Sequence, residues 1–342
     1  MKTVIDTPVS IGVDLAKQSF DVALAPEAAT PSDWRGLAHG HIEHPPDSRA
    51  GMRAFMRWVA KRVGPGQCER IVAESTGRIA HRFAAALADK NLPRVAIVNP
   101  ARPKAFIASL GIRDKTDRID AACLALYGAM HRPAPTPVRS AAEKALRELT
   151  RLREACVAER TAWQCRLSET QGRSVQRTMI QASVRHFEKQ VEKLDRQIQA
   201  QIDSAPALSR QVEAIQQITG LKRVCASVLT AELGDLSKYS RTELVAAAGV
   251  YPRHGESGTS VRQRPRMVKG GGGRVRRVLY MAAMSLLRSK GRLRELIERH
   301  RAEGKPDMVI IGIMMRKLLL IARAVVRNNG VYDPSRIANV RG

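Results

Sequence analysis

Three prolines at alternate positions, Pro133, Pro135 and Pro137, divide the sequence into parts with different patterns. Proline fixes its own backbone angle and lacks an N–H donor, so neither a helix nor an inner strand continues through such a segment. Before the prolines, short apolar runs alternate with helical spacing; after them, from residue 141 to about residue 205, glycine is almost absent and charge is dense. The sequence therefore predicts three parts: an α/β domain (residues 1–132), a linker and helical arm (133–205) and an α-rich domain (206–342).

The first domain is predicted to contain one mixed sheet covered by helices. Its apolar runs have the length of strands and cover residues 10–14, 20–25, 39–44, 71–74 and 95–98. Apolar residues at helical spacing predict helices over residues 48–63, 79–89 and 116–130. Three early strands followed by alternating helix and strand favour a single sheet with helices packed on it.

The helical arm carries an apolar seam. Its members alternate at spacings of three and four, and they are Val184, Phe187, Val191, Leu194 and Ile198. This spacing is typical of a short coiled coil, which would pair two copies of the chain. The alternative is one amphipathic helix of an intramolecular bundle, and a seam of little more than two heptads does not decide between them.

The charge of the chain indicates a polyanionic partner. Lysine and arginine number 58 against 32 acidic residues, giving a formal net charge of +26. Such an excess repels itself unless a polyanion neutralises it, and nucleic acid does so with release of counterions. The ordinary alternative is a basic enzyme without such a partner. No basic amphipathic anchor stands apart at either end, which disfavours a membrane surface.

A cytoplasmic location is the expectation. The five cysteines are scattered without a metal-binding or disulfide pattern, and the first ten residues carry no apolar core of a signal peptide. The most apolar run, residues 308–326, is interrupted by Arg316, Lys317 and Arg323, which indicates a buried helix rather than a membrane span.

Four acidic residues stand where a metal site could form. Asp14 and Glu74 each end an apolar run, and Asp117 and Asp120 are three residues apart and so share one face of a helix. Carboxylates brought together repel one another, and Mg²⁺ removes that repulsion because it prefers oxygen ligands. Two such ions would stabilise the attacking and leaving oxygens of a phosphoryl transfer. Each acid alone also fits a helix cap, a turn or a solvated helix face.

A basic segment of the last third contains a candidate nucleophile. Twelve lysines and arginines and one acid, Glu256, lie between residues 253 and 294. Ser257 stands beside Gly258, with Arg262, Arg264 and Arg266 close along the chain. A serine among guanidinium groups suits phosphoryl transfer, in which charge stabilisation is the main task. A flexible basic loop that only binds phosphates is the alternative. Beyond this segment the sequence predicts helices from about residue 274.

These residues form part of a wider pattern. The early segments are Ile11-Gly12-Val13-Asp14, Ala73-Glu74-Ser75-Thr76-Gly77, Val98-Asn99-Pro100 and Lys115-Thr116-Asp117-Arg118-Ile119-Asp120-Ala121. The later segments are Gly249-Val250-Tyr251-Pro252, Ser257-Gly258-Thr259-Ser260, Leu279-Tyr280-Met281-Ala282-Ala283 and Arg316-Lys317-Leu318-Leu319. Together, and in this order over nearly the whole chain, they resemble the DEDD transposases of bacterial insertion sequences. That family includes a pilin-gene invertase and serine recombinases guided by a bridge RNA.

The resemblance implies a RuvC-like domain of the RNase H fold, a helical coiled-coil middle and an α-rich C-terminal transposase domain. It implies that Asp14, Glu74, Asp117 and Asp120 are a catalytic tetrad that binds Mg²⁺. It further implies that Ser257 attacks the DNA backbone to give a covalent phosphoserine, followed by strand exchange. Small polar residues, Thr259 and Ser260, follow the nucleophile as in the family.

The expected partners are double-stranded DNA, as donor and target, and a bridge RNA. Strand exchange needs at least two nucleophiles, so a dimer or, in the synaptic complex, a tetramer is expected. Charge and position suggest phosphate contacts at Lys115, Arg262, Arg266, Lys269, Arg274, Arg276 and Arg277. Two alternatives remain: a RuvC-like structure-specific nuclease that uses metal-activated water, and a nucleic-acid-binding protein without enzymatic activity.

Overall fold

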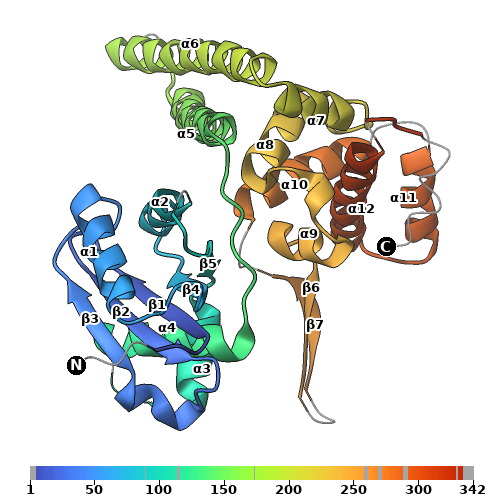
Figure 1. Cartoon of the computed structure of the whole chain (residues 1–342). Helices are drawn as coiled ribbons and strands as arrows, with labels where there is room; N and C mark the ends of the chain where they lie inside the picture. Colours follow the sequence, from blue (N-terminus) through green and yellow to red (C-terminus); the bar gives the residue numbers. More distant parts are fainter. Residues whose placement is uncertain are drawn as a thin grey trace. The chain divides into compact units, whose positions relative to one another are not determined.

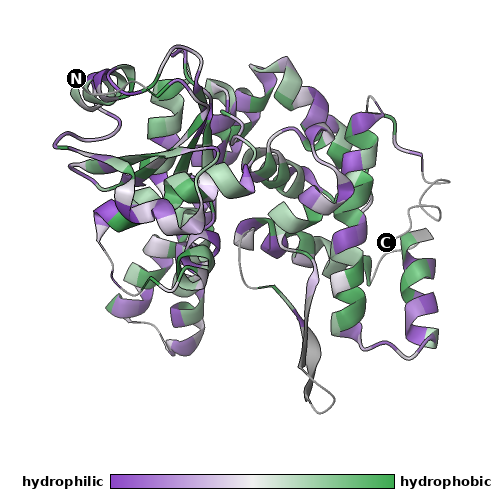
Figure 2. Ribbon diagram, turned by 60° about the horizontal axis from the view of Figure 1, so that its bottom comes forward, coloured by the Kyte–Doolittle hydropathy of each residue, from purple (hydrophilic) through white to green (hydrophobic). Residues whose placement is uncertain are grey.

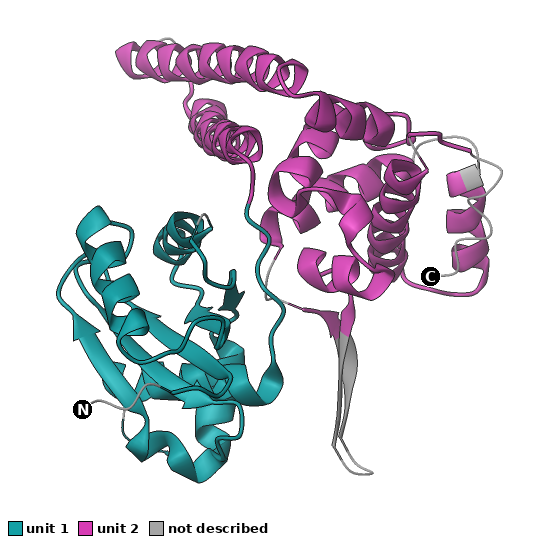
Figure 3. Cartoon of the chain, in the orientation of Figure 1, with its two compact units in different colours: residues 1–138 teal, residues 139–342 magenta. Residues whose placement is uncertain are grey.

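The computed structural model describes residues 5–88, 90–112, 114, 116–172, 174–257, 261–268, 272–287, 292–328 and 330–333. For residues 253–257, 261–265 and 292 it describes only the course of the backbone. The chain forms two compact units, residues 1–138 and residues 139–342 (Figure 3). The change of unit follows directly after the three prolines. The helical arm and the last third of the chain belong to the same unit.

Unit 1 contains the predicted mixed sheet (Figure 1). Its strands are β1 (Val9–Leu15), β2 (Phe20–Pro26), β3 (Ala38–Ile42), β4 (Cys68–Glu74) and β5 (Val95–Val98). They lie in the order β3-β2-β1-β4-β5. The β1–β2 and β2–β3 pairs are antiparallel, whereas β1–β4 and β4–β5 are parallel. The prediction of a mixed α/β N-terminal region is therefore confirmed.

Helices cover both faces of this sheet. They are the 3-10 helix η1 (Pro31–Gly36), α1 (Arg49–Ala60), α2 (Arg78–Leu87), α3 (Ala101–Ser109) and α4 (Asp117–His131). On one face α1 and α2 enclose a core in which the rings of Phe20, Phe55 and Phe83 lie 5.5–6.3 Å apart. On the other face, α3 and α4 pack over small residues of the sheet, among them Ala23, Ala25 and Ala96. These small residues allow α4 to lie close to the strands.

Unit 2 is rich in helices, as predicted. Its helices are α5 (Ala141–Glu169), α6 (Val175–Asp203), α7 (Pro206–Gln216), α8 (Arg223–Leu233), the 3-10 helix η2 (Leu236–Lys238), α9 (Arg241–Ala248), α10 (Gly273–Leu286), α11 (Arg292–Ala302) and α12 (Asp307–Arg327). Most of them enclose one large apolar core. The most apolar run of the sequence forms α12, largely green in Figure 2, and within the described residues no helix has the length and apolar character to cross a membrane.

The arm consists of two long helices, α5 and α6, that pack along each other as a hairpin (Figure 1). A capping box at Ser140 begins α5, and Arg153 of α5 donates two hydrogen bonds to Asp195 of α6 at 2.7 and 3.1 Å. The apolar seam is buried within this single chain: Val184, Val191, Leu194 and Ile198 are at most 8% exposed. Burial within one chain supports the intramolecular alternative for these positions.

The segment that carries Ser257 forms a β-hairpin, although its composition had indicated a loop. Its strands are β6 (Pro252–Ser257) and β7 (Val261–Met267), which pair antiparallel with a register shift between Arg253 and Gly255. Apolar or neutral residues alternate with arginines through β7, and this period of two is the strand signal. The glycine- and arginine-rich composition obscured that signal, because such residues are uncommon in strands.

Candidate functional site

The alternation of side chains along β1 determines which face of the sheet carries Asp14. Its odd-numbered residues are apolar and belong to the core under α1 and α2. Because side chains alternate between the two faces of a strand, Ser10, Gly12 and Asp14 occupy the face covered by α4. Asp14 is the last of the three and lies near the end of the strand.

Two glycines bring α4 into close contact with this face. A Cβ added at Gly12 would lie 2.1 Å from the carbonyl oxygen of Ala121 and 2.2 Å from the amide nitrogen of Ala125. A Cβ added at Gly128 would lie 2.0 Å from Oγ of Ser10. The backbone of α4 therefore rests on β1, and its first turn lies beside the end of the strand, where Asp14 stands. The glycine that precedes Asp14 by two residues is thus a packing requirement of the site.

Replacing Gly12 with Ala should lower the free energy of unfolding by about 3 kcal/mol, because the added methyl group meets backbone atoms that cannot rotate away. Urea denaturation measures this loss. Gly36→Ala is the matched control, since a Cβ at Gly36 would meet nothing within 4 Å and its φ is not positive. Equal stability of the two variants would contradict the close approach of α4 to β1.

The other three acids of the tetrad lie on the neighbouring strand β4 and on the first turn of α4, near Asp14. Glu74 ends β4, one residue beyond the Val13–Ala73 pair that joins β4 to β1 in parallel. Asp117 and Asp120 lie in the first turn of α4, which Thr116 caps by accepting a hydrogen bond from the amide of Ile119. The positive end of the helix dipole favours acidic residues there. The structure thus brings the four predicted acids together.

The electrostatics of Asp14 confirm this proximity. Its pKa is raised from 3.8 to about 7, and burial of the carboxyl group is the largest cause. Negative charges of its neighbours contribute further, and in decreasing order these are Asp120, Asp117, Glu74 and Asp21. A carboxyl group whose pKa is raised by burial together with nearby acids is typical of a functional site.

The set of donors fits magnesium. All four groups are carboxylates, the hard oxygen ligands that Mg²⁺ prefers, and two of them lie at the open end of the sheet. Among the described residues, no three acidic, histidine or cysteine side chains already surround one point closely enough to coordinate an ion.

A fifth acid and two histidines, none of them predicted from the sequence, lie beside the tetrad. Asp21 of β2 lies directly opposite Asp14 in the antiparallel register and is only 6% exposed. Its Oδ1 accepts a hydrogen bond from Nε2 of His39 at 2.6 Å, and its Oδ2 accepts one from Nδ1 of His41 at 2.8 Å. The alternation of Asp21 with Ala23 and Ala25 was the available signal, because it places all three on the face under α4.

In unit 2, Ser257 is the last residue of β6, and its register partner is Val261. Arg262 and Arg266 lie in β7, opposite Glu256 and Arg253, and Arg266 is exposed. The predicted residues Lys115 and Lys269 fall outside the described residues, as do Gly258, Thr259 and Ser260. The structure thus places the candidate serine at the end of a strand in a basic hairpin.

Two of the arginines predicted to contact phosphates form ion pairs within the chain. Arg274 and Arg277 of α10 both donate hydrogen bonds to Glu154 of α5. Nearby, Glu232 of α8 accepts hydrogen bonds from Arg147 and Arg151 of α5 at 3.1 and 2.8 Å. Burial alone would raise the pKa of Glu232, but these guanidinium groups lower it. This network joins the arm to the helix that follows the hairpin. Arg276 also lies on α10, between the two paired arginines.

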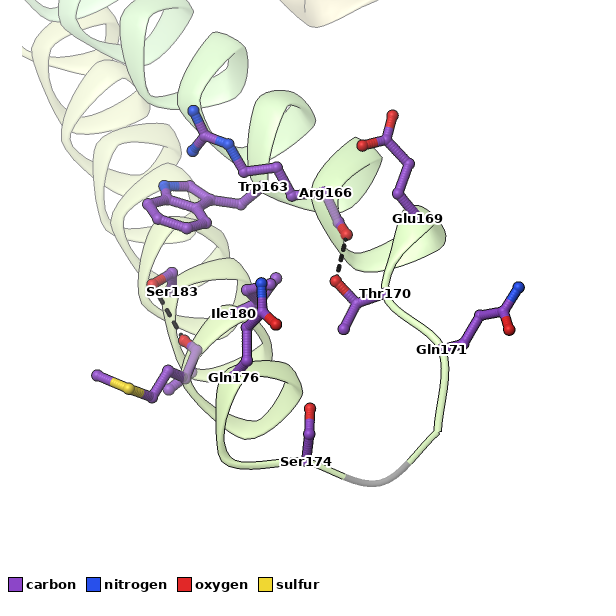
Figure 4. A pocket seen from close by; sticks show the side chains of 11 residues that line it. Trp163, Arg166, Glu169, Thr170, Gln171, Ser174, Gln176, Ile180 and Ser183 are labelled. Carbon is purple, nitrogen blue, oxygen red and sulfur yellow. Dashed lines mark hydrogen bonds between the residues drawn. The ribbon is translucent and has the colours of Figure 1, made fainter.

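A pocket of about 1230 Å³ lies at the end of the α5–α6 hairpin (Figure 4). The guanidinium of Arg166 stacks 4.4 Å from the ring centre of Trp163 on its wall. The other lining residues are mainly small or polar and include Thr170, Ser174 and Ser183. Among the described residues that line it, Glu169 alone has a carboxylate, whereas the site in unit 1 has an acidic cluster.

Two family models and two named proteins match this chain. Residues 11–170 match a family model of the IS110 DEDD type, described as a transposase, and residues 212–298 match the model of the transposase IS116/IS110/IS902 family. The chain is also 29% identical over 331 residues to the pilin gene-inverting protein of Moraxella bovis, covering 94% of this chain and 97% of that protein. The pilin gene-inverting protein of Moraxella lacunata matches to the same extent. The chain belongs to the IS116/IS110/IS902 family of transposases.

Proposed function

We propose that this transposase cuts and rejoins DNA by a magnesium-assisted transesterification, as a site-specific recombinase of an insertion sequence. The observation that carries the proposal is the acidic site of unit 1, where burial and the nearby charges of Asp120, Asp117 and Glu74 raise the pKa of Asp14 to about 7. We further propose that this unit has a RuvC-like, RNase H-type fold, which its mixed five-stranded sheet supports.

The tetrad would hold Mg²⁺, and the metal would supply stabilisation of charge on the phosphate that reacts. The residues of this chain would orient the ion: Asp14 and Glu74 from the sheet, and Asp117 and Asp120 from the first turn of α4. Burial first, and then the negative charges of neighbouring acids, raise the pKa of Asp14, and a bound cation would favour its ionised form.

Ser257 would be the nucleophile in this reaction. Attack of its Oγ on a backbone phosphorus exchanges one phosphodiester bond for another of similar energy, so strand joining needs no ATP. The basic hairpin supports this role, because Arg253 and Arg266 stand at directly opposed positions. A nucleic-acid phosphate is the natural counter-ion of such a basic segment.

A structure-specific nuclease is the second candidate, because the acidic site lies wholly within unit 1. Metal-activated water would then attack the phosphorus, and Ser257 would be dispensable. The similarity to two proteins named for gene inversion favours recombination over simple cleavage.

We propose that a bridge RNA selects the DNA sites and that a dimer or tetramer performs the exchange. The net charge of +26 and the 4% content of aromatic residues support binding of nucleic acid mainly through phosphates. Sequence selection would then come from base pairing. Because the apolar seam of α6 is buried against the rest of its own chain, assembly would use another surface.

The test uses protein purified without nuclease treatment and a supercoiled plasmid that carries the gene with its flanking DNA. We expect Mg²⁺, but not excess chelator, to give a covalent protein–DNA adduct and recombinant plasmid. Ribonuclease treatment should abolish site-specific products, and the extracted RNA should restore them, whereas heat-inactivated ribonuclease should have no effect. Efficient recombination by RNA-free protein would refute the guide. Absence of any magnesium-dependent adduct or recombinant would refute the recombinase.

A further inference from the structure

The acidic site extends across the sheet as a row of ionisable side chains. His41, Asp21 and Asp14 lie in register on β3, β2 and β1, and Glu74 follows on β4. Residues directly opposite each other on paired strands point to the same face, which here is the face covered by α4. His41 therefore lies two strands from Asp14, a backbone separation of about 10 Å, at the rim of the acidic site.

Both oxygens of Asp21 face β3, where each accepts a hydrogen bond from a histidine. An ionised carboxylate only accepts hydrogen bonds, so the ring nitrogens that face it must carry hydrogen. His39 donates from Nε2 and His41 donates from Nδ1. Asp21 thus fixes the orientation of both imidazoles, as the aspartate does in an aspartate–histidine pair.

The two histidines differ in which ring nitrogen bonds to Asp21 and in how exposed their side chains are. His39 uses its outer nitrogen for Asp21, and its side chain is only 19% exposed. His41 uses Nδ1, so its outer nitrogen Nε2 remains available, and its side chain is 45% exposed. A buried carboxylate behind an imidazole with an accessible Nε2 is the arrangement of a proton-transfer pair.

We propose that His41, oriented by Asp21, transfers the proton of the DNA leaving group at the acidic site; this inference rests on the proposed function. As the nucleophile bonds to phosphorus, the bond between phosphorus and the sugar oxygen breaks. That oxygen takes a proton from Nε2 of protonated His41, which leaves a neutral imidazole still bound to Asp21 through Nδ1–H. During rejoining the sugar hydroxyl attacks, and its proton returns to Nε2. The hydroxyl of the nucleophile gives its proton to water during cutting and regains one from water during rejoining, so protons and bonds balance over both steps.

Asp21 is the positioning residue in this scheme. It contributes to the raised pKa of Asp14, so its negative charge also acts on the neighbouring acid. Replacing Asp21 with Asn should remove that charge and loosen the orientation of His41. The variant should therefore keep magnesium binding and lose rate, a combination that a purely structural role would not produce.

The experiment compares His41→Ala with His44→Ala in the full chain with its bound nucleic acid, on the supercoiled plasmid carrying the gene and its flanks. His44 is the matched control, because it is exposed and has no hydrogen bond to Asp21. We expect His41→Ala to reduce the rate of adduct formation about 100-fold, and DNA affinity in chelator to change less than about twofold. Added imidazole should restore much of the rate. His44→Ala should match the wild type.

Asp21→Asn should lose rate to a similar extent without rescue by imidazole, while Mg²⁺ still raises its melting temperature. An unchanged rate for His41→Ala in the presence of an active wild type would overturn the proton-transfer role and leave the recombinase intact. A loss of rate without imidazole rescue, accompanied by a lower melting temperature, would likewise overturn it and assign His41 a structural role. An inactive wild type in Mg²⁺ would instead refute the proposed function.

Discussion

Replacing Ser257 with Ala should abolish the covalent protein–DNA adduct while leaving DNA binding nearly unchanged. The hydroxyl oxygen is the atom that would join phosphorus, and alanine supplies no substitute, so the expected loss is complete. The rest of the basic hairpin, including Arg262 and Arg266 on β7, remains to bind phosphates. Trapping on denaturing gels measures the adduct, and gel shift in chelator measures binding.

Ser260→Ala is the matched control, because it removes the same hydroxyl group three residues further along the chain. We expect it to keep most of the adduct. Ser257→Cys offers a second variant, since a thiol retains a nucleophilic atom at the same place. An adduct of undiminished yield from Ser257→Ala would assign the nucleophile to another residue. Cleavage without any adduct, in that variant and in the wild type alike, would favour the nuclease that uses metal-activated water.

The positions of the four acids could be predicted because local patterns determine them. Apolar runs of strand length end at Asp14 and Glu74, and the three-residue spacing of Asp117 and Asp120 places them on one helix face. What the sequence did not reveal was the means of bringing them together. That depends on Gly12, whose missing side chain lets α4 rest on β1, a contact between residues more than 100 positions apart.

The Asp21–His41 pair illustrates the limit of local reasoning. Asp21 and His41 are 20 residues apart, and their contact depends on the register of β2 against β3. A shift of one residue in that register would place the histidine on the opposite face of the sheet. Without the register, two histidines in an apolar run are ordinary strand residues, and an aspartate next to a phenylalanine is an ordinary turn residue.

The seam of α6 shows a different limit. Its spacing of three and four residues indicates that one helix face is buried. The spacing does not distinguish burial against a second copy from burial against the same chain. The answer depends on the loop that follows α5, which is short enough to return α6 along its neighbour. The partly buried ion pair of Arg153 with Asp195 further fixes this pairing within the chain.

Replacing Asp14 with Asn should abolish cleavage and at the same time stabilise the metal-free protein at pH 8. The pKa of Asp14 is about 7 in the folded protein, against 3.8 for an ordinary aspartate. The folded state therefore holds this proton more tightly than the unfolded state, so stability present below pH 4 is lost as the pH rises through 7. Asn keeps the neutral form, and at pH 8 it should add on the order of 2 kcal/mol, a value reduced for partial solvation.

At pH 5 the Asn variant should gain less stability, because most of the wild-type Asp14 is already protonated there.

Magnesium should raise the melting temperature of the wild type at pH 8 by linkage and should not raise that of Asp14→Asn. Asp114→Asn is the matched control: it lies outside the tetrad, is exposed, and should leave both the metal response and cleavage unchanged. Thermal unfolding at pH 5 and pH 8, with and without Mg²⁺, measures all of these effects. If Asp14→Asn were less stable than the wild type at pH 8 without metal, burial and the neighbouring acids would not be destabilising the ionised form of Asp14. A magnesium response retained by this variant would remove Asp14 from the metal ligands.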